Sequence, residues 1–328
     1  MRRLTQAATG GGNSPAFSSV LLASSFLCSR QSPPSLECHA SRIQTVGSPK
    51  CCTGEKLNMI HELQQANSKV LALHCSFPEA RAIIEGNNPG WLFVDDLNTP
   101  SAGLVWAKGM EGFYLIGDAN NTKFLDELDI FTEQVLKPRL HDLGMTWLEI
   151  GGDESWNLSI ENAYRKRRLK SSQQWVYTLK ATKQEPGKQF KAINDRRVER
   201  IDRDLLARLF EDNEKFLLSK LTRFWYSVDA FINTGLGYVF LDGEEIVSLC
   251  FSGFVAGNIH VIDIETKVIH RRKGYAESVS QAFVADCINR EIQPYWDCMA
   301  ENIASARLAE RLGFRKNRIY TLYSVSLE

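Results

Sequence analysis

The sequence contains the same succession of expected elements twice. Alternating apolar runs bounded by Gly, Pro and Asn predict strands, and apolar residues at three- and four-residue spacing predict helices. Residues 90–180 and 237–327 each give the order strand–strand–strand–helix–strand–helix–strand. The two final strands share the tripeptide Tyr-Thr-Leu, at 177–179 and at 320–322. This shared order of seven elements predicts an internal duplication of one α/β fold.

Local signals give the positions of these elements. In the first block the expected strands cover 90–96, 101–107, 112–118, 146–152 and 173–180, and the expected helices cover 122–143 and 154–168. In the second block the expected helices cover 201–210, 211–232, 276–290 and 302–312, and the strands cover 237–241, 245–253, 258–266, 294–299 and 318–327. Asp242-Gly243, between two of these strands, is a strong hairpin signal.

The first 56 residues differ from the rest of the chain. Ten of the first 48 are serine, and the first acidic residue is Glu37, so burial in this segment cannot offset its chain entropy. We expect a disordered leader, either a non-native extension ahead of Met59 or an organellar transit peptide. The expected parts after it are a degenerate lobe at 59–180, a linker at 181–200 and a catalytic lobe at 201–328.

The composition argues against several classes of function. Lys and Arg together number 39, and so do Asp and Glu. This charge balance does not indicate binding to a nucleic acid or to a membrane surface. No apolar run approaches the ~18 residues of a transmembrane helix. The eight cysteines form no Cys-x-x-Cys pair and no zinc-like spacing with histidine, so we expect no metal. We expect a cytoplasmic monomer or homodimer, or an organellar protein if the leader is a transit peptide.

The strongest signal for chemistry is HRRKGYA, residues 270–276, between an expected strand and an expected helix. The first N–H groups of a helix have no partner within it and lie at its positive end, which suits a diphosphate. Gly274 permits close approach of a ligand to the backbone, and Ala276 keeps the next contact small. Three cations come before the glycine: Arg271, Arg272 and Lys273. An ordinary basic surface turn is the alternative interpretation.

A second motif follows the next strand. Within residues 301–314 the sequence reads Asn-x-x-Ser-x-x-Leu-x-x-x-x-Gly-Phe, from Asn302 to Phe314. Gly313 is a typical residue just after a helix end, because it adopts the left-handed conformation freely. Asn302 and Ser305 share the first turn of this helix, so both are expected to face a ligand in the cleft. A plain N-cap is the alternative for Asn302.

With both motifs in place, the sequence resembles the GNAT superfamily of acyl-CoA-dependent N-acyltransferases. Arg271-x-x-Gly274-x-Ala276 is similar to the pyrophosphate loop of that superfamily, and residues 302–314 are similar to its following helix. A longer pattern runs from residue 264 to residue 314 and reads IET…HRRKGYA…PYWDC…N..S..LAERLGF. It resembles two-lobed bacterial acetyltransferases that include the zwittermicin-resistance type. The clear resemblance covers about residues 222–325. It implies two tandem GNAT-like lobes, each a mixed, mostly antiparallel sheet flanked by helices. The first lobe is degenerate, because 116–124 replaces the loop.

The resemblance implies a role for each matched position. Ile264, Glu265 and Thr266 would lie on the strand that pairs with the pantetheine arm of acetyl-CoA. The diphosphate would be held by the loop Arg271, Arg272, Lys273, Gly274, Tyr275 and Ala276. Asn302 would bind the pantetheine or the reacting region, and Ser305 would lie near the phosphates or the adenine. The strand at 294–299 would splay away from the strand at 258–266, which opens the site.

The chemistry needs little beyond positioning. A neutral amine attacks the thioester, a base takes the amine proton, and an acid can protonate the departing thiolate. Glu265 and Asp263 are the candidate bases. Many members of the superfamily carry a tyrosine directly after the motif leucine, but Ala309 stands there. Tyr320, Tyr323 or solvent are the candidate acids.

We therefore predict an acetyl-CoA-dependent N-acetyltransferase that acts on a primary amine of a small molecule. The candidate acceptors are amino-containing antibiotics or metabolites. One alternative acceptor is a protein or peptide amine. The alternative from another class is a CoA-binding regulatory module without turnover.

Overall fold

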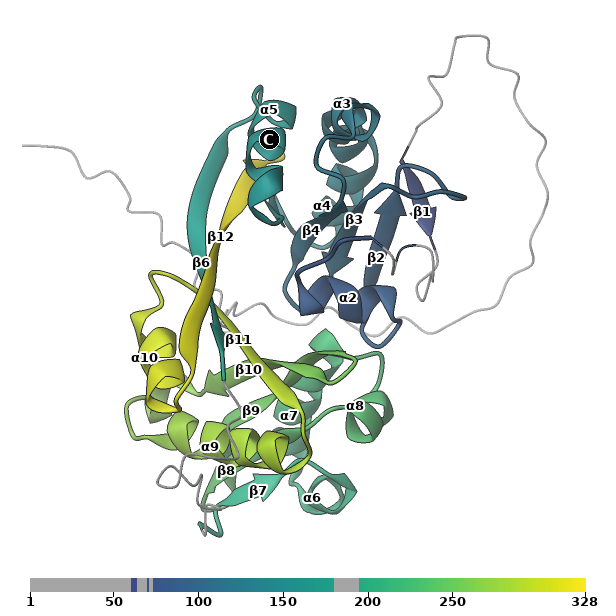
Figure 1. The fold of residues 1–328 in the computed structure, drawn as a ribbon. Coiled ribbons are helices and arrows are strands. Elements are labelled where there is room, and N and C mark those ends of the chain that lie inside the picture. The colour runs from purple at the N-terminus through teal and green to yellow at the C-terminus, as the bar shows by residue number, and fades with distance from the viewer. Residues whose placement is uncertain (1–59, 64–69, 71–72, 180–194) are drawn as a thin grey trace, which may run out of the picture.

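The computed structural model describes residues 60–63, 70, 73–179 and 195–328 (Figure 1). The expected leader at 1–56 and most of the expected linker at 181–200 lie outside the described residues. The end of that linker forms strand β7, Val198–Arg200, which pairs with β8.

Twelve strands form one sheet, in the order β1-β2-β3-β4-β5-β12-β6-β11-β10-β9-β8-β7. The strands of the first half are β1 (His61–Leu63), β2 (Gly90–Val94), β3 (Ala102–Ala107), β4 (Gly112–Gly117), β5 (Trp147–Gly151) and β6 (Leu169–Thr178). The remaining strands of the second half are β8 (Gly237–Asp242), β9 (Glu245–Ala256), β10 (Ile259–Thr266), β11 (Gln293–Met299) and β12 (Arg315–Ser326). The pairs β4–β5 and β10–β11 are parallel, and the other neighbours are antiparallel. The predicted two-lobed α/β fold with mixed, mostly antiparallel pairing is confirmed.

The last strand of each half pairs with the other half. β6 lies between β11 and β12, and β12 also pairs with β5 of the first half. In Figure 1 these two long strands run side by side from one half of the molecule to the other. The two lobes therefore share one continuous sheet, which the duplication alone did not predict.

The helices pack on the sheet in three groups. The helices are α2 (Pro78–Ile84), α3 (Thr122–Phe131), α4 (Lys137–Asp142), α5 (Asn157–Ala163), α6 (Arg203–Arg208), α7 (Glu211–Phe224), α8 (Val228–Thr234), α9 (Tyr275–Asn289) and α10 (Ile303–Arg311). Helices α3, α4 and α5 share a core with strands of the first half. Helices α9 and α10 share a core with one face of β9, whereas α2, α6, α7 and α8 share a core with residues on its other face. Within the described ranges, no helix has the length and apolar character needed to span a bilayer.

Polar N-caps fix where several helices begin. Asn121 accepts a hydrogen bond from the N–H of Phe124 (3.0 Å), and Asp202 accepts one from Leu205 (2.9 Å). Each cap satisfies an amide that the first turn of a helix leaves without a partner. The start of α7 has no such cap, but three acidic residues in its first turn interact favourably with the positive end of the helix dipole.

Most elements expected from the sequence are present, and five differ, one of which is strand β7 in the expected linker. The helix expected at 154–168 ends at Ala163 because β6 begins at Leu169. The helix expected at 211–232 is interrupted between α7 and α8, where Ser227 caps the second helix. Strand β1 and helix α2 were not predicted. Cys250, Cys287 and Cys298 are buried and form no disulfide.

Helix α2 ties the first half to the second. It packs against β9 and β10, and the loop after it carries Asn88, which is fully buried. The amide nitrogen of Asn88 donates to the carbonyls of Phe224 and Gly253, both at 2.9 Å. Its side-chain oxygen accepts from the N–H of Val255 at 3.1 Å. One side chain thus satisfies three buried backbone groups of the second half.

We expect Asn88→Ala to destabilise the protein by about 3 kcal/mol, because three buried groups lose a partner at about 1 kcal/mol each. The urea midpoint of unfolding measures this loss. Asn87→Ala is the matched control, because the amide of Asn87 makes a single hydrogen bond to the second half, with the carbonyl of Val255. Equal midpoints for the two variants would contradict the anchoring role of Asn88.

Candidate functional site

The centre of the second half is a wedge between two parallel strands. β10 and β11 are paired from Ile259 and Gln293 to Val261 and Tyr295, and both strands continue beyond that point. β10 also shifts register against β9 between Val261 and Ile262. Main-chain groups of both strands are therefore left facing the space between them, as the resemblance implied.

A cavity of about 710 Å³ occupies this wedge. Its lining includes nine of the predicted site residues: Ile264, Thr266, Arg271, Arg272, Gly274, Tyr275, Ala276, Asn302 and Ser305. The lining does not include Glu265, Lys273 or Tyr320. Residues from the first half also contribute, namely Glu79 of α2 and Gly109 and Met110 of the turn between β3 and β4.

One end of the cavity is the start of α9. Gly274 is the N-cap residue with φ of +85°, and no side chain among the described residues caps this helix. Apart from Gly274 itself and its two chain neighbours, no heavy atom of the described part of the chain lies within 4 Å of the position that a Cβ on Gly274 would take. The first amides of a 15-residue helix therefore face the cavity with room for an anion beside them.

Tyr275 holds this loop in place. Its hydroxyl donates to Asp242 at 2.9 Å, and its ring stacks on Phe240 with the ring centres 4.3 Å apart. The hydrogen bond to Asp242 raises the pKa of Tyr275, so the phenol stays protonated. These contacts fix the helix start, while Arg271 and Arg272 add positive charge to the cavity wall.

The side of the cavity next to α10 is polar and already hydrogen-bonded. Asn302 accepts from the N–H of Ser305 at 3.1 Å, so it is the N-cap of α10. The hydroxyl of Ser305 accepts from the indole N–H of Trp296 at 3.0 Å. Both residues line the cavity, and the ligand contacts expected for them stay predictions.

The two candidate bases lie differently. Asp263 lines the cavity, whereas Glu265 does not. The carboxylate of Glu265 forms an ion pair with Lys220 of α7, at 2.7 Å. Because Glu265 lies outside the cavity lining and its carboxylate is engaged by Lys220, the geometry gives no support to Glu265 as the base, and its role stays a prediction.

Two other carboxyl groups lie at the apex of the wedge. Asp297, on β11, and Glu79, in the first turn of α2, both line the cavity. Burial and the negative charge of Asp297 raise the pKa of Glu79. Burial also raises the pKa of Asp297, although a hydrogen bond from Tyr320 and the charge of Arg318 oppose this effect.

The candidate acids are engaged elsewhere. Tyr320 donates its hydroxyl to Asp297 at 2.8 Å, and burial raises its pKa well above the usual value. Tyr323 donates to Glu161 at 2.9 Å and belongs to the core of the first half. Ala309 is fully buried. Neither tyrosine lines the large cavity, so the acid stays without an assigned residue.

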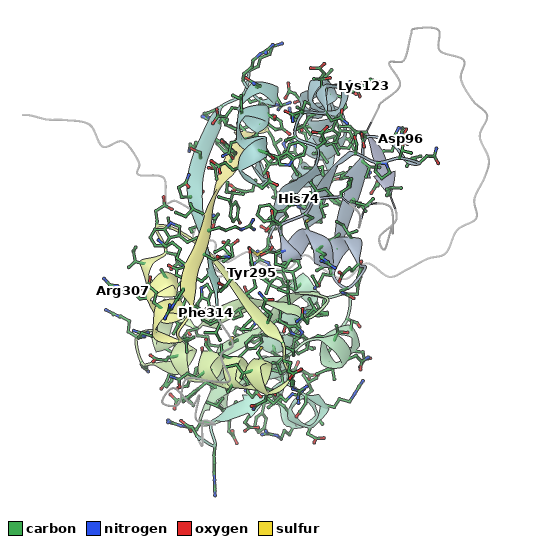
Figure 2. The ribbon with its side chains drawn as sticks, viewed as in Figure 1. His74, Asp96, Lys123, Tyr295, Arg307 and Phe314 are labelled. Carbon is green, nitrogen blue, oxygen red and sulfur yellow. The ribbon has the colours of Figure 1, made fainter. Side chains whose placement is uncertain are left out.

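Sequence reasoning missed the carboxyl groups at the apex. Asp297 lies on the strand at 294–299. The resemblance implied that this strand splays away from its neighbour, and it implied no role for its side chains. Glu79 lies in a helix that no apolar periodicity indicated, and its position beside β11 depends on packing between the halves. Figure 2 shows Tyr295, two residues before Asp297 on β11, at the level where the halves meet. Within the described ranges, no group of three or more His, Cys, Asp and Glu residues is placed to hold a metal ion.

Comparisons with known proteins are consistent with this geometry. The family described as GNAT acetyltransferase matches residues 75–323. An uncharacterized N-acetyltransferase of Bacillus subtilis (strain 168), YdfB, is 29% identical over 249 residues, which cover 74% of this chain and 88% of that protein. A crystal structure of a GCN5-related N-acetyltransferase-like protein from Streptococcus suis has a TM-score of 0.54 at 22% identity. The match covers 79% of this chain and 96% of that one.

Proposed function

Because the chain belongs to the GNAT acetyltransferase family and is therefore an acetyltransferase, we propose that it transfers the acetyl group of acetyl-CoA to a primary amine of a small molecule. The observation that carries this proposal is a single cavity with an anion-binding helix start at one end and carboxyl groups at its apex. In acetyl-CoA the diphosphate and the thioester also lie at different positions along the molecule, so the diphosphate can meet the helix start while the thioester lies near the carboxyl groups.

The lining fits acetyl-CoA part by part. The open space at Gly274 and the first amides of α9 suit the diphosphate, with Arg271 and Arg272 beside it. β10 and β11 pair only as far as Val261 and Tyr295, so the stretch of β10 with Ile264, Glu265 and Thr266 runs along the wedge, where the pantetheine arm would lie. The thioester then reaches the register shift at Ile262, where main-chain N–H groups polarise its carbonyl.

The acceptor approaches from the side where the halves meet. Met110 of the first half and Arg223 and Phe224 of α7 line this side of the cavity. Both halves line this side, so the acceptor has to fit between them, which favours a small amine over a long peptide. Family membership favours transfer over the non-catalytic alternative. A cytoplasmic location and a monomeric or dimeric state remain predictions of the sequence.

Release of free thiol from acetyl-CoA tests the proposal. The purified protein is incubated with acetyl-CoA and, in turn, an amino sugar, an α-amino acid, a polyamine and a short peptide with a free N-terminus. We expect amine-dependent thiol release with at least one of the three small amines. Faster release with the peptide would support the peptide alternative. Saturable binding of acetyl-CoA without thiol release from any amine would support the regulatory alternative and overturn the proposal.

A further inference from the structure

We propose that Glu79 and Asp297, one from each half of the molecule, share one proton at the apex of the wedge and accept the proton of the acceptor ammonium. This inference rests on the proposed function, since it assigns the base for the same reaction. It also gives the first half a chemical role, because Glu79 belongs to α2.

Glu79 is an unusual buried group. Its side chain is fully buried, and neither of its carboxyl oxygens has a hydrogen-bond partner among the described residues. A buried carboxylate without a partner costs several kcal/mol, so such groups are rare unless a proton or a ligand compensates them. Because Glu79 lines the cavity, an acceptor ammonium in the cavity supplies that compensation.

Asp297 is held in a defined orientation. One carboxyl oxygen accepts from the hydroxyl of Tyr320 at 2.8 Å, and the other oxygen is buried with no partner in the described part of the chain. The pairing of β11 with β10 ends at Tyr295, so the carboxyl of Asp297 lies just past the apex, where the two strands separate. Tyr320 is thus a positioning residue that leaves one oxygen of Asp297 for the substrate.

The surroundings do not neutralise the two carboxyl groups. The titratable groups that act on the pair are Cys75, Tyr114, Tyr295, Arg318 and Tyr320. Arg318 is the cation of this set, and its guanidinium donates to the carbonyl of Ser76 (2.8 Å) and the hydroxyl of Tyr295 (3.3 Å). Asp263 and Arg223 line the same cavity. Two neighbouring buried carboxyl groups with so little compensation cannot both ionise at neutral pH, so the pair keeps one proton.

The reaction balances with this pair as base. The acceptor enters as an ammonium ion and gives one proton to the pair, which becomes neutral. The free amine forms a bond to the thioester carbon, and the C–S bond breaks with its electrons on sulfur. The second proton of the nitrogen passes to this sulfur through water in the cleft. The pair later releases one proton to solvent, which restores its single negative charge.

The catalytic test compares Glu79→Gln, Asp297→Asn and Glu149→Gln with the unchanged protein, using the best amine of the panel. Glu149 is the matched control, because its carboxyl is also buried with a raised pKa but does not line the large cavity. We expect kcat to fall ~100-fold or more for the first two variants, a typical cost of losing a general base, and by less than about twofold for the control. Acetyl-CoA affinity, measured by titration calorimetry, should stay unchanged in all three.

Tyr320→Phe tests the positioning role separately. Its hydrogen bond lowers the pKa of Asp297, so its removal should shift the rising limb of the pH–rate profile to higher pH. A lower rate with an unshifted profile would show that Tyr320 acts on structure alone.

Unfolding in urea as a function of pH gives a readout that needs no substrate. Raised folded-state pKa values mean that the folded protein holds a proton that the unfolded chain releases above about pH 4. Stability should therefore fall as the pH rises from about 5 to about 9, and Glu79→Gln and Asp297→Asn should each flatten this fall.

The outcomes separate this inference from the proposed function. Amine-dependent turnover that survives both substitutions would leave the proposed function standing and overturn the pair as the base. If Glu79→Gln and Asp297→Asn leave the pH dependence of stability as it is in the unchanged protein, the shared proton is overturned. If no amine is acetylated although acetyl-CoA binds, the proposed function fails, and the base role fails with it.

Discussion

The second half of the chain, expressed alone as residues 181–328, is expected to be insoluble or unfolded. β11 and β12 do not pair with each other, because β6 of the first half lies between them. Without β6 both strands lose a full set of main-chain hydrogen bonds, and exposed edges of this kind promote aggregation. The core of the second half also loses Tyr177, which is fully buried between α9, α10 and the sheet.

Circular dichroism and a urea unfolding curve measure this result, and the complementary fragment is its control. Co-expression of residues 59–180 with residues 181–328 restores every strand of the sheet, so we expect the two fragments to co-purify as a folded complex. The complex differs from residues 59–328 of the intact chain by one missing peptide bond, and it also lacks residues 1–58. A cooperative unfolding transition for 181–328 alone would contradict the exchange of the last strands, and the two lobes would then be independent domains.

Local features of the fold were predictable because their causes lie within a few residues. Asp242-Gly243 forms the turn between β8 and β9, since Gly243 supplies the positive φ that such turns need. Gly274 and Gly313 also have positive φ, at the start of α9 and just after α10. Gly274 therefore predicted the start of α9, which is the end of the cavity where the diphosphate is expected.

The exchange of the last strands was not predictable, because it depends on partners far away in the sequence. β6 and β12 carry the same Tyr-Thr-Leu pattern, so each suits either half equally well. Their pairing with the opposite half depends on how the two sheets meet, and periodicity carries no information about this contact.

The apex of the site escaped prediction for a similar reason. Asp263 and Glu265 were the candidate bases, and alternation along a strand puts both on one face without showing which face that is. In the structure Asp263 lines the cavity, whereas Glu265 pairs with Lys220 of α7. Glu79 reaches the apex because α2 packs on β9 and β10, a contact between the halves. Sequence motifs therefore indicate the cofactor end of the site, whereas tertiary contacts determine the acceptor end.

Gly274→Glu is expected to lower the affinity for acetyl-CoA by more than ~100-fold. The Cβ of the new residue would project into the open space beside the first amides of α9, where the diphosphate is expected. Its carboxylate would also place a negative charge against the phosphates, and the loss of two hydrogen bonds to a charged group, at about 1.5 kcal/mol each, accounts for a loss of this size. Titration calorimetry with acetyl-CoA measures the loss, and circular dichroism checks that α9 remains folded.

Gly274→Ala separates the charge and bulk of the new side chain from backbone strain. Any L-residue at φ of +85° costs about 1–2 kcal/mol, so both variants lower the unfolding free energy similarly. Alanine adds a single methyl group and no charge, so its acetyl-CoA affinity should fall far less than that of the glutamate variant. If both variants lose affinity equally, backbone strain explains the loss. If the glutamate variant binds acetyl-CoA normally, the diphosphate does not lie at the start of α9.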